Sequence, residues 1–353
     1  MARALALAER GLYTTTPNPR VGCVIVRGGE ILGEGFHERA GGPHAEIAAL
    51  ADTRSRGHDP EGATLYCTLE PCTHTGRTPP CTDAIVAAGI ARMVVAMADP
   101  NPQAAHGAQV LRAAGIAVDV GLMEREARAL NCGFVARVTR GRPWVRMKVA
   151  ASLDGRTALA DGASRWITGA EARADGHAFR ARACAIVTGI GTVLSDDPEL
   201  TVRAVTTPRQ PLRVVVDRRG HVPPQAKVLR GGALVVTADA RPSAWPADVE
   251  HLALPDARGR VDLAGLLREL ARRGCNEVHI EAGARLNAAL LEAGLVDEVL
   301  AYVAPSLIGD PARGVAQRRD ALASLDARTR LAFDDVKRIG DDIRIRARVI
   351  EKD

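Results

Sequence analysis

The first hundred residues contain a set of side chains whose types and spacing suit metal-assisted chemistry. His44 and Glu46 lie two positions apart, and Cys72 and Cys81 follow later in the chain. One imidazole and two thiolates suit Zn²⁺, and three protein ligands leave a fourth position open for water. Zinc lowers the pKa of such a water to roughly 7, and Glu46 is placed to move its proton to a leaving group. We therefore predict a catalytic zinc site with one ion per chain.

A structural zinc site is the main alternative. Structural sites normally have four protein ligands, and His74 is available as the fourth. This interpretation leaves Glu46 without a role, so we favour catalytic zinc. The other five cysteines stand singly and are expected to be small buried residues: Cys23, Cys67, Cys132, Cys184 and Cys275.

Two successive runs of strand and helix patterns must position these residues. Strands over 21–27 and 30–36 flank Gly28-Gly29, a hairpin signal, and a helix over 45–56 follows His44. Gly and Pro at 140–143 mark a boundary. We therefore expect two α/β domains, 1–142 and 143–353. Further expected strands are 64–68, 91–97, 146–151, 183–188, 212–217, 233–237, 277–281 and 298–304, and further helices are 82–89, 108–114, 123–137, 171–182, 263–273 and 284–293.

Composition excludes several classes of protein. The chain has no apolar run long enough to span a membrane. Its net charge is +5, but the arginines are dispersed, and only ten Phe, Trp and Tyr are present. A nucleic-acid groove with stacking aromatics is therefore disfavoured. Scattered cysteines in odd number favour thiols or a metal over a disulfide framework. We expect a cytoplasmic protein with a small-molecule substrate, no nucleic acid and no membrane partner.

The zinc pattern resembles the H-x-E…P-C…C signature of the cytidine deaminase superfamily, although eight residues separate the two cysteines here. Segments 17–22, 35–37 and 64–81 resemble the bifunctional riboflavin-biosynthesis deaminase–reductase family. That resemblance implies a cytidine-deaminase-like α/β sandwich acting on a diaminopyrimidinone that carries a phosphoribosylamino group. It also implies that four residues face the substrate: Asn18, His37, His74 and Arg77.

The second half is similar to the reductase part of the same family, over segments 147–158, 164–168 and 189–203. The resemblance implies a dihydrofolate-reductase-like α/β domain, in which hydride from NADPH opens the ribosylamino group to a ribitylamino group. The implied substrate contacts are Ser164, Arg180, Leu200, Arg203 and Glu281. The implied cofactor contacts are Ala150, Trp166, Thr192, Asp196, Arg218, Gly283, Ala284, Arg285, Leu286, Asn287, Ala288 and Ala289.

For some of these positions, residue chemistry supports the role independently of the family resemblance. Residues 281–284 predict a strand end, a Gly turn and a helix start, which form a natural pyrophosphate site, although Gly283 would also serve simply to end a strand. Arg218 departs from the small polar residue expected there, and either meets the 2′-phosphate of NADPH or is solvated. Arg180 and Arg203 suit a sugar phosphate. Lys148 and Asp154 both remain candidates for a proton donor.

Three rival functions remain. A nucleic-acid-directed zinc deaminase would leave the second half unexplained. A zinc-stabilised binding module would lack a carboxylate near the metal, whereas Glu46 is present. A chain with only one working half, the deaminase with an accessory domain, is disfavoured because both sets of motifs are complete apart from position 218. The family resemblance also implies a homo-oligomer.

Overall fold

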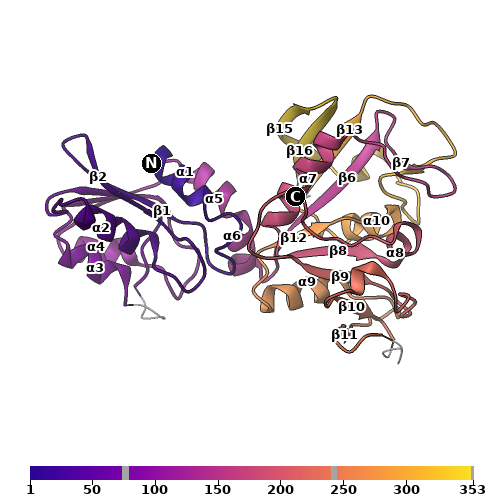
Figure 1. Cartoon of the computed structure of the whole chain (residues 1–353), viewed down its shortest axis with the longest axis horizontal. Coiled ribbons are helices and arrows are strands. Elements are labelled where there is room, and N and C mark those ends of the chain that lie inside the picture. The colour runs from indigo at the N-terminus through magenta and orange to yellow at the C-terminus, as the bar shows by residue number, and fades with distance from the viewer. Residues whose placement is uncertain (74–78, 240–244, 351–353) are drawn as a thin grey trace. The chain divides into compact units, whose positions relative to one another are not determined.

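The computed structural model describes residues 1–73, 79–239 and 245–350 (Figure 1). The chain divides into two compact units, Met1–Gly141 and Arg142–Asp353. Each unit contains its own sheet and its own buried core. The two-domain α/β fold expected from the sequence is confirmed. Among the described residues, no helix is both long enough and apolar enough to cross a membrane.

The first unit is built on a five-stranded sheet with the order β2-β1-β3-β4-β5. β1 pairs antiparallel with both β2 and β3, whereas β3, β4 and β5 are parallel. The predicted hairpin is confirmed. The elements are α1 (Ala2–Glu9), β1 (Gly22–Arg27), β2 (Glu30–Phe36), α2 (Ala45–Ser55), β3 (Thr64–Leu69), α3 (Cys81–Ala87), β4 (Arg92–Met97), α4 (Gly107–Ala113), β5 (Ala117–Val120), α5 (Glu124–Leu130) and α6 (Cys132–Arg140).

The single helix predicted over 123–137 is wrong, because the structure has α5 and α6 separated at Asn131. The Asn131 side chain is buried there. It accepts a hydrogen bond from the Arg20 amide at 2.8 Å and donates one to the Arg20 carbonyl at 2.9 Å. These bonds attach the helix junction to the segment that enters β1. A contact between residues so far apart in the chain leaves no periodic signal in the sequence.

The second unit is built on a nine-stranded sheet with the order β11-β10-β9-β8-β12-β6-β13-β16-β15. The strands from β11 to β13 are parallel, and β16 and β15 complete the sheet as an antiparallel hairpin. The strands are β6 (Trp144–Ser152), β8 (Ala185–Gly189), β9 (Leu212–Val216), β10 (Leu234–Thr237), β11 (Glu250–Ala253), β12 (Glu277–Ile280), β13 (Glu298–Ala304), β15 (Leu331–Ile339) and β16 (Asp342–Val349).

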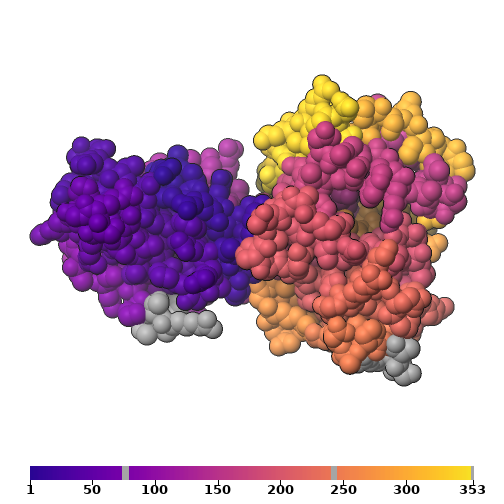
Figure 2. Space-filling view, in the orientation of Figure 1, coloured from indigo at the N-terminus to yellow at the C-terminus, as the bar shows by residue number. Residues whose placement is uncertain are grey.

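Helices cover both faces of this sheet. α9 and α10 pack with the apolar side of β6, whose members include Val145 and Met147, and α7 packs over Leu300 and Tyr302. A small second sheet joins β7 (Arg156–Ala158) to β14 (Arg313–Gly314). The helices are α7 (Ala170–Arg182), α8 (Ile190–Asp196), α9 (Leu263–Arg272) and α10 (Ala284–Glu292), with the short 3₁₀ turns η1 (Lys227–Leu229) and η2 (Leu325–Ala327). Figure 2 shows the chain as a space-filling surface.

Glycine on β2 allows α2 to lie unusually close to the sheet. A Cβ at Gly35 would come within 2.3 Å of the Ala49 nitrogen and 2.6 Å of the Ala45 oxygen, and a Cβ at Gly33 would meet Thr53. The obstructing atoms at Gly35 are backbone, which has no rotamer to move aside. Because α2 begins directly after His44, this contact sets the position of the predicted zinc ligand.

We predict that Gly35→Ala destabilises the first unit by about 1–3 kcal/mol, the usual cost of overpacking a close contact. Chemical unfolding followed by circular dichroism measures the effect. The control is Ile31→Ala, which removes an exposed side chain from the same strand and should change stability by less than about 0.5 kcal/mol. Equal stability of Gly35→Ala and wild type would contradict the close packing.

Candidate functional site

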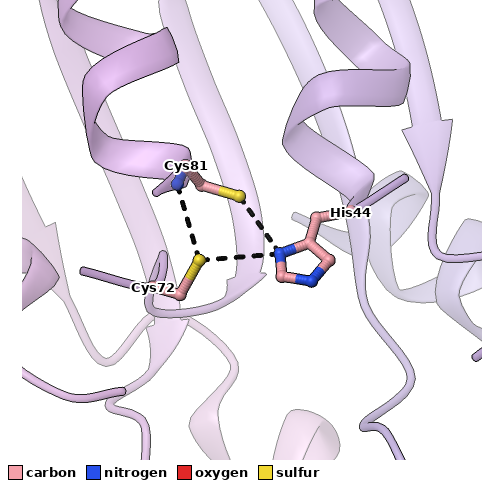
Figure 3. A group of neighbouring side chains, drawn as sticks. All are labelled: His44, Cys72 and Cys81. Carbon is pink, nitrogen blue, oxygen red and sulfur yellow. Dashed lines mark hydrogen bonds between the residues drawn. The ribbon is translucent and has the colours of Figure 1, made fainter. Parts of the chain in front are cut away.

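Three elements of the first unit bring the predicted zinc ligands together. His44 precedes α2, Cys72 follows β3, and Cys81 is the first residue of α3. The His44 Nδ1 atom lies 3.2 Å from the Cys81 Sγ and 3.6 Å from the Cys72 Sγ (Figure 3). The Cys81 amide also donates to the Cys72 Sγ at 3.4 Å. One atom from each residue lies within 4.8 Å of the others, which makes this a group that could hold a metal ion.

The spacing of these atoms fits zinc. Zn²⁺ binds sulfur at about 2.3 Å and imidazole nitrogen at about 2.0–2.1 Å in tetrahedral geometry, so ligand atoms around it lie roughly 3.5 Å apart. Hydrogen bonds from Cys81, and then from His44, lower the pKa of the Cys72 thiol to about 4 against the opposing effect of burial. A thiolate is the form that binds metal. The Nδ1 atom, and not Nε2, faces the sulfurs.

Glu46 lies in the first turn of α2, beside the metal group. Its side chain is buried, and it lines the same pocket as His44 and Cys72. Burial raises the pKa of its carboxyl group to about 6, and a bound cation would lower that value because it favours the charged form. A carboxyl group with a pKa near neutrality can both accept and return a proton.

His44 and Cys72 of the metal group line a pocket in the first unit. Asn18 and His37, two of the residues implied to face the substrate, line the same pocket. The His37 ring is within hydrogen-bond distance of the Pro43 carbonyl through Nδ1, at 2.9 Å, and of the Asn18 Nδ2 through Nε2, at 3.0 Å. The carbonyl can only accept, so Nδ1 carries the hydrogen and Nε2 accepts from Asn18. His37 therefore fixes which way the Asn18 amide points.

Sequence reasoning missed a carboxylate that supports this pocket. Glu70 is buried, and it accepts hydrogen bonds from the Asp99 amide at 3.0 Å and the Ala108 amide at 2.9 Å. It thereby ties the end of β3 to the loop after β4, which contributes Asp99 and Asn101 to the pocket wall. The available signal was a charged residue between an apolar strand and Pro71-Cys72.

Helix α6 contributes a second group that the sequence reasoning missed. Phe134 and Arg137 line the pocket, and the Arg137 Nη2 donates to the Pro17 carbonyl at 3.0 Å. This contact connects α6 to the segment that carries Asn18. His74 and Arg77, the other two predicted substrate contacts, lie outside the described residues.

In the second unit, predicted substrate contacts meet at the end of β12. Arg180 of α7 forms a two-pronged ion pair with Glu281, with one contact at 2.8 Å, and also donates to the Thr201 carbonyl at 3.0 Å. Burial opposes ionisation of Glu281, yet Arg180 holds the pKa of its carboxyl group below the usual range. The guanidinium group of Arg180 is already paired with Glu281. We therefore no longer expect Arg180 to be the main contact for a sugar phosphate.

Lys148 lies beside this ion pair. Burial lowers the pKa of its ammonium group, while the nearby Glu281 charge opposes that shift. Asp154, the other candidate proton donor, accepts hydrogen bonds from the Ser152 hydroxyl and from the Ile308 and Gly309 amides. The first of these bonds contributes most to lowering the Asp154 pKa to about 2. Asp154 is thus a charged residue that stabilises its loop. Lys148 is therefore the better candidate for the proton donor.

The predicted cofactor contacts lie partly together. Gly283 is the N-cap of α10, and a Cβ there would lie 3.9 Å from the Thr192 Oγ1 of α8. The Thr188 hydroxyl donates to the Glu281 carbonyl at 2.7 Å and connects the ends of β8 and β12. Two helix N-termini therefore meet at the ends of neighbouring parallel strands, where ligands of open α/β sheets bind. Exposed or half-buried positions in this region are Ala150, Asp196, Ala284, Arg285, Leu286 and Ala289.

Other predicted contacts in the second unit are less suited to a ligand. Leu200 is buried and its side chain belongs to an apolar cluster, and Ala288 is also buried. The Asn287 Nδ2 donates to the Val315 carbonyl at 3.0 Å. Trp166, Arg203 and Arg218 are exposed, and Ser164 is half-buried. The Arg173 guanidinium lies 4.5 Å from the centre of the Trp166 ring, and Arg203 pairs with Glu199 at 2.9 Å.

We predict that purified protein contains one zinc per chain and that Cys81→Ala loses it. Three ligands of a small tetrahedral ion act together, so loss of one removes most of the affinity. Elemental analysis after dialysis measures the metal. Cys132→Ala, which changes a half-buried cysteine of the same unit that lies outside the group, should retain zinc. Full zinc content in Cys81→Ala would contradict the assignment.

Comparisons with known proteins match both units. The family model described as the cytidine and deoxycytidylate deaminase zinc-binding region matches residues 1–97, and the RibD C-terminal domain model matches residues 143–345. The riboflavin biosynthesis protein RibD of Escherichia coli is 46% identical over 97% of this chain and 96% of its own length. The same protein from Haemophilus influenzae is 44% identical over 98% and 95%, respectively.

Solved structures extend this likeness to the whole fold. The RibD structure from Acinetobacter baumannii (form 1) has a TM-score of 0.90 and 43% identity, covering 99% of this chain and 98% of that chain. A Thermotoga maritima structure described as a diaminohydroxyphosphoribosylaminopyrimidine deaminase/5-amino-6-(5-phosphoribosylamino)uracil reductase has a TM-score of 0.90 and 36% identity, covering 99% and 97%. The chain therefore belongs to the riboflavin biosynthesis protein RibD family.

Proposed function

We propose that the chain is a bifunctional enzyme of riboflavin biosynthesis. Its first unit converts 2,5-diamino-6-(5-phosphoribosylamino)pyrimidin-4(3H)-one into 5-amino-6-(5-phosphoribosylamino)uracil, and its second unit reduces the ribosyl group to ribityl with NADPH. The observation that carries this proposal is the placement of Glu46 beside the His44, Cys72 and Cys81 group. The full-length likeness to proteins named as deaminase and reductase supports the substrate.

In the deamination, we assign the proton transfers to Glu46. His44, Cys72 and Cys81 would hold the zinc, which would supply a Lewis acid for the attacking water. The water oxygen bonds to ring carbon C2, and the amine on that carbon leaves as ammonia. Glu46 takes the proton released by the water and returns it to the departing nitrogen. Burial of Glu46 keeps this transfer away from bulk solvent.

We assign recognition of the pyrimidine to Asn18, oriented by His37. The hydrogen bond from the Asn18 Nδ2 to His37 leaves Oδ1 as an acceptor for the substrate. The amino groups and ring N–H of a diaminopyrimidinone are the matching donors. Among the described residues that line the pocket, Phe134 is the one Phe, Trp or Tyr. A series of stacking aromatics, as a nucleic-acid deaminase would need, is not part of that wall, so we favour the small-molecule substrate.

In the reductase site, we assign the nicotinamide cofactor to the N-termini of α8 and α10, where amide groups favour a pyrophosphate. NADPH supplies the hydride, and the protein supplies position and charge. We assign Lys148 as the polar group nearest the reacting centre, held beside the Arg180–Glu281 pair. Arg180 then positions Glu281, while exposed Arg203 and half-buried Ser164 remain for the substrate phosphate. We keep Arg218 as a candidate for the NADPH 2′-phosphate.

The assembly and location of the protein are also proposals. We infer a homo-oligomer in the cytoplasm, with no nucleic-acid partner, from the family resemblance and from the dispersed arginines.

A coupled assay with two variants tests the function. Glu46→Gln should lose roughly 10²–10⁴-fold in ammonia release, the usual contribution of a general acid–base group, yet still oxidise NADPH when given the deaminated uracil. Glu281→Gln should show the reverse pattern, because it leaves Lys148 and Arg180 without their shared partner. Ammonia and NADPH are followed together on zinc-loaded protein.

Glu30→Gln and Glu292→Gln provide matched controls from each unit and should leave both activities at the wild-type level. Two results would overturn the proposal: release of ammonia by Glu46→Gln at the wild-type rate, or wild-type protein that releases ammonia without consuming NADPH. The second result would favour a deaminase with an accessory domain.

A further inference from the structure

A short segment of the second unit carries the exposed side chain of Arg203, and contacts hold this segment along its length. Leu200 is buried in an apolar cluster although its backbone has a φ of +52°, which is unfavourable for leucine. The Gln210 side chain accepts from the Val202 amide at 2.7 Å and donates to the Val202 carbonyl at 3.1 Å. Strained residues of this kind persist where surrounding contacts over-determine the backbone, and they cluster at ligand-binding sites.

Helix α7 holds the same segment through two side chains one turn apart. Arg180 donates to the Thr201 carbonyl at 3.0 Å, and the Arg203 amide donates to the His177 Nδ1 atom at 3.1 Å. Residues three positions apart lie on the same face of a helix, so His177 and Arg180 contact the segment side by side. The sequence patterns pointed to Arg180 and Arg203 as substrate contacts, but they did not single out His177.

The contact with Arg203 determines the state of the His177 ring. A backbone N–H can only donate, so Nδ1 accepts and the ring hydrogen lies on Nε2. A protonated imidazole carries hydrogen on both nitrogens and cannot accept this bond. Burial, and then the charges of Arg180 and Arg203, lower the pKa of His177 to about 4. The ring is therefore neutral, and able to accept, at neutral pH.

The surroundings of His177 carry an excess of positive charge. The charged groups near its ring are Arg180 of the same helix, Arg203 of the segment, Lys148 of β6 and Glu281 of β12. Glu281 is the one acidic group among these four, and it already pairs with Arg180 at 2.8 Å. A doubly charged phosphate would offset the excess, and an arginine side chain offers the paired N–H donors that phosphate accepts.

We propose that His177 is a positioning residue for the substrate phosphate: its Nδ1 atom holds the backbone of Arg203 so that the Arg203 guanidinium can bind the phosphate. This guanidinium contacts Glu199 at 2.9 Å and the Thr201 hydroxyl at 2.8 Å, and both contacts are exposed to water. Phosphate would replace Glu199 as its partner. The proposal rests on the reductase function proposed above and adds a residue to its substrate site.

Two substitutions of nearly equal shape separate the acceptor atom from the bulk of the ring. His177→Asn keeps an acceptor oxygen near the position of Nδ1, whereas His177→Leu has a similar outline and no acceptor. His177→Leu should raise the KM for the phosphoribosyl uracil about tenfold, the size of one lost hydrogen bond. The kcat value and the KM for NADPH should stay close to wild type, because only substrate binding is weakened. His177→Asn should keep a KM close to wild type, as should the control Ala174→Ser, at an exposed position of α7.

A double-mutant cycle tests whether His177 acts through Arg203. In an Arg203→Met background, His177→Leu should cause no further rise in KM, because the guanidinium that it positions is absent. An equal rise in both backgrounds would indicate a separate, structural effect of His177 and would overturn the proposal. Equal KM values for His177→Asn and His177→Leu would overturn it as well.

Binding of ribose 5-phosphate to the full chain, measured by isothermal titration calorimetry, separates this proposal from the proposed function. The affinity should fall about tenfold in His177→Leu and be retained in His177→Asn, whether or not NADPH is oxidised. Wild-type protein that does not bind ribose 5-phosphate would overturn the phosphate site. Binding that depends on His177, in a protein that oxidises no NADPH, would support the phosphate site and contradict the reductase function alone.

Discussion

The first unit depends on the requirement that three soft ligands, from three separate elements, converge at the spacing of one small ion. His44 comes before α2, Cys72 after β3 and Cys81 at the start of α3. A tetrahedral metal tolerates little variation in these distances, so each element must be held closely. Gly33 and Gly35 let α2 lie against β2, and Glu70 ties the end of β3 to the pocket loop. These contacts in the surrounding fold thus fix the positions of the three metal ligands.

The second unit must pair buried charges, because charged side chains line a buried face of its sheet. Arg146 is fully buried between Glu277 and Glu298, at 3.0 and 2.9 Å. Arg182 of α7 also binds Glu277, at 2.8 Å. Removing one partner from such a set leaves an unpaired buried charge, which is costly. On the same strands, toward their carboxyl ends, Lys148 and Glu281 continue this charged row into the proposed reductase site. The structural charges and those of the proposed reductase site therefore form one continuous layer.

Features that have a local sequence pattern could be predicted from the sequence alone. Apolar runs identified the central strands, and the types and spacing of His44, Glu46, Cys72 and Cys81 identified a group that the structure brings together. β16 escaped notice although its apolar residues alternate with arginines in the pattern of a half-buried strand, whereas in β15 the extra residue Asp334 breaks that alternation. The roles of Glu70 and Asn131 and the pairing of Arg180 with Glu281 also escaped notice. Each depends on residues brought together by folding, and no spacing rule reports them.

In the proposed function, one chain performs a hydrolytic and a reductive step on the same molecule. Isotope labelling tests it most directly: the diaminopyrimidinone phosphoribosyl substrate is incubated with wild-type protein in ¹⁸O-labelled water with NADPH deuterated at C4, and the product is analysed by mass spectrometry. We predict a single product that carries one heavy oxygen on the pyrimidine ring and one deuterium on C1 of the ribityl chain. A product that carries heavy oxygen in the ring but no deuterium, or deuterium without heavy oxygen in the ring, would show that the chain does not perform both steps.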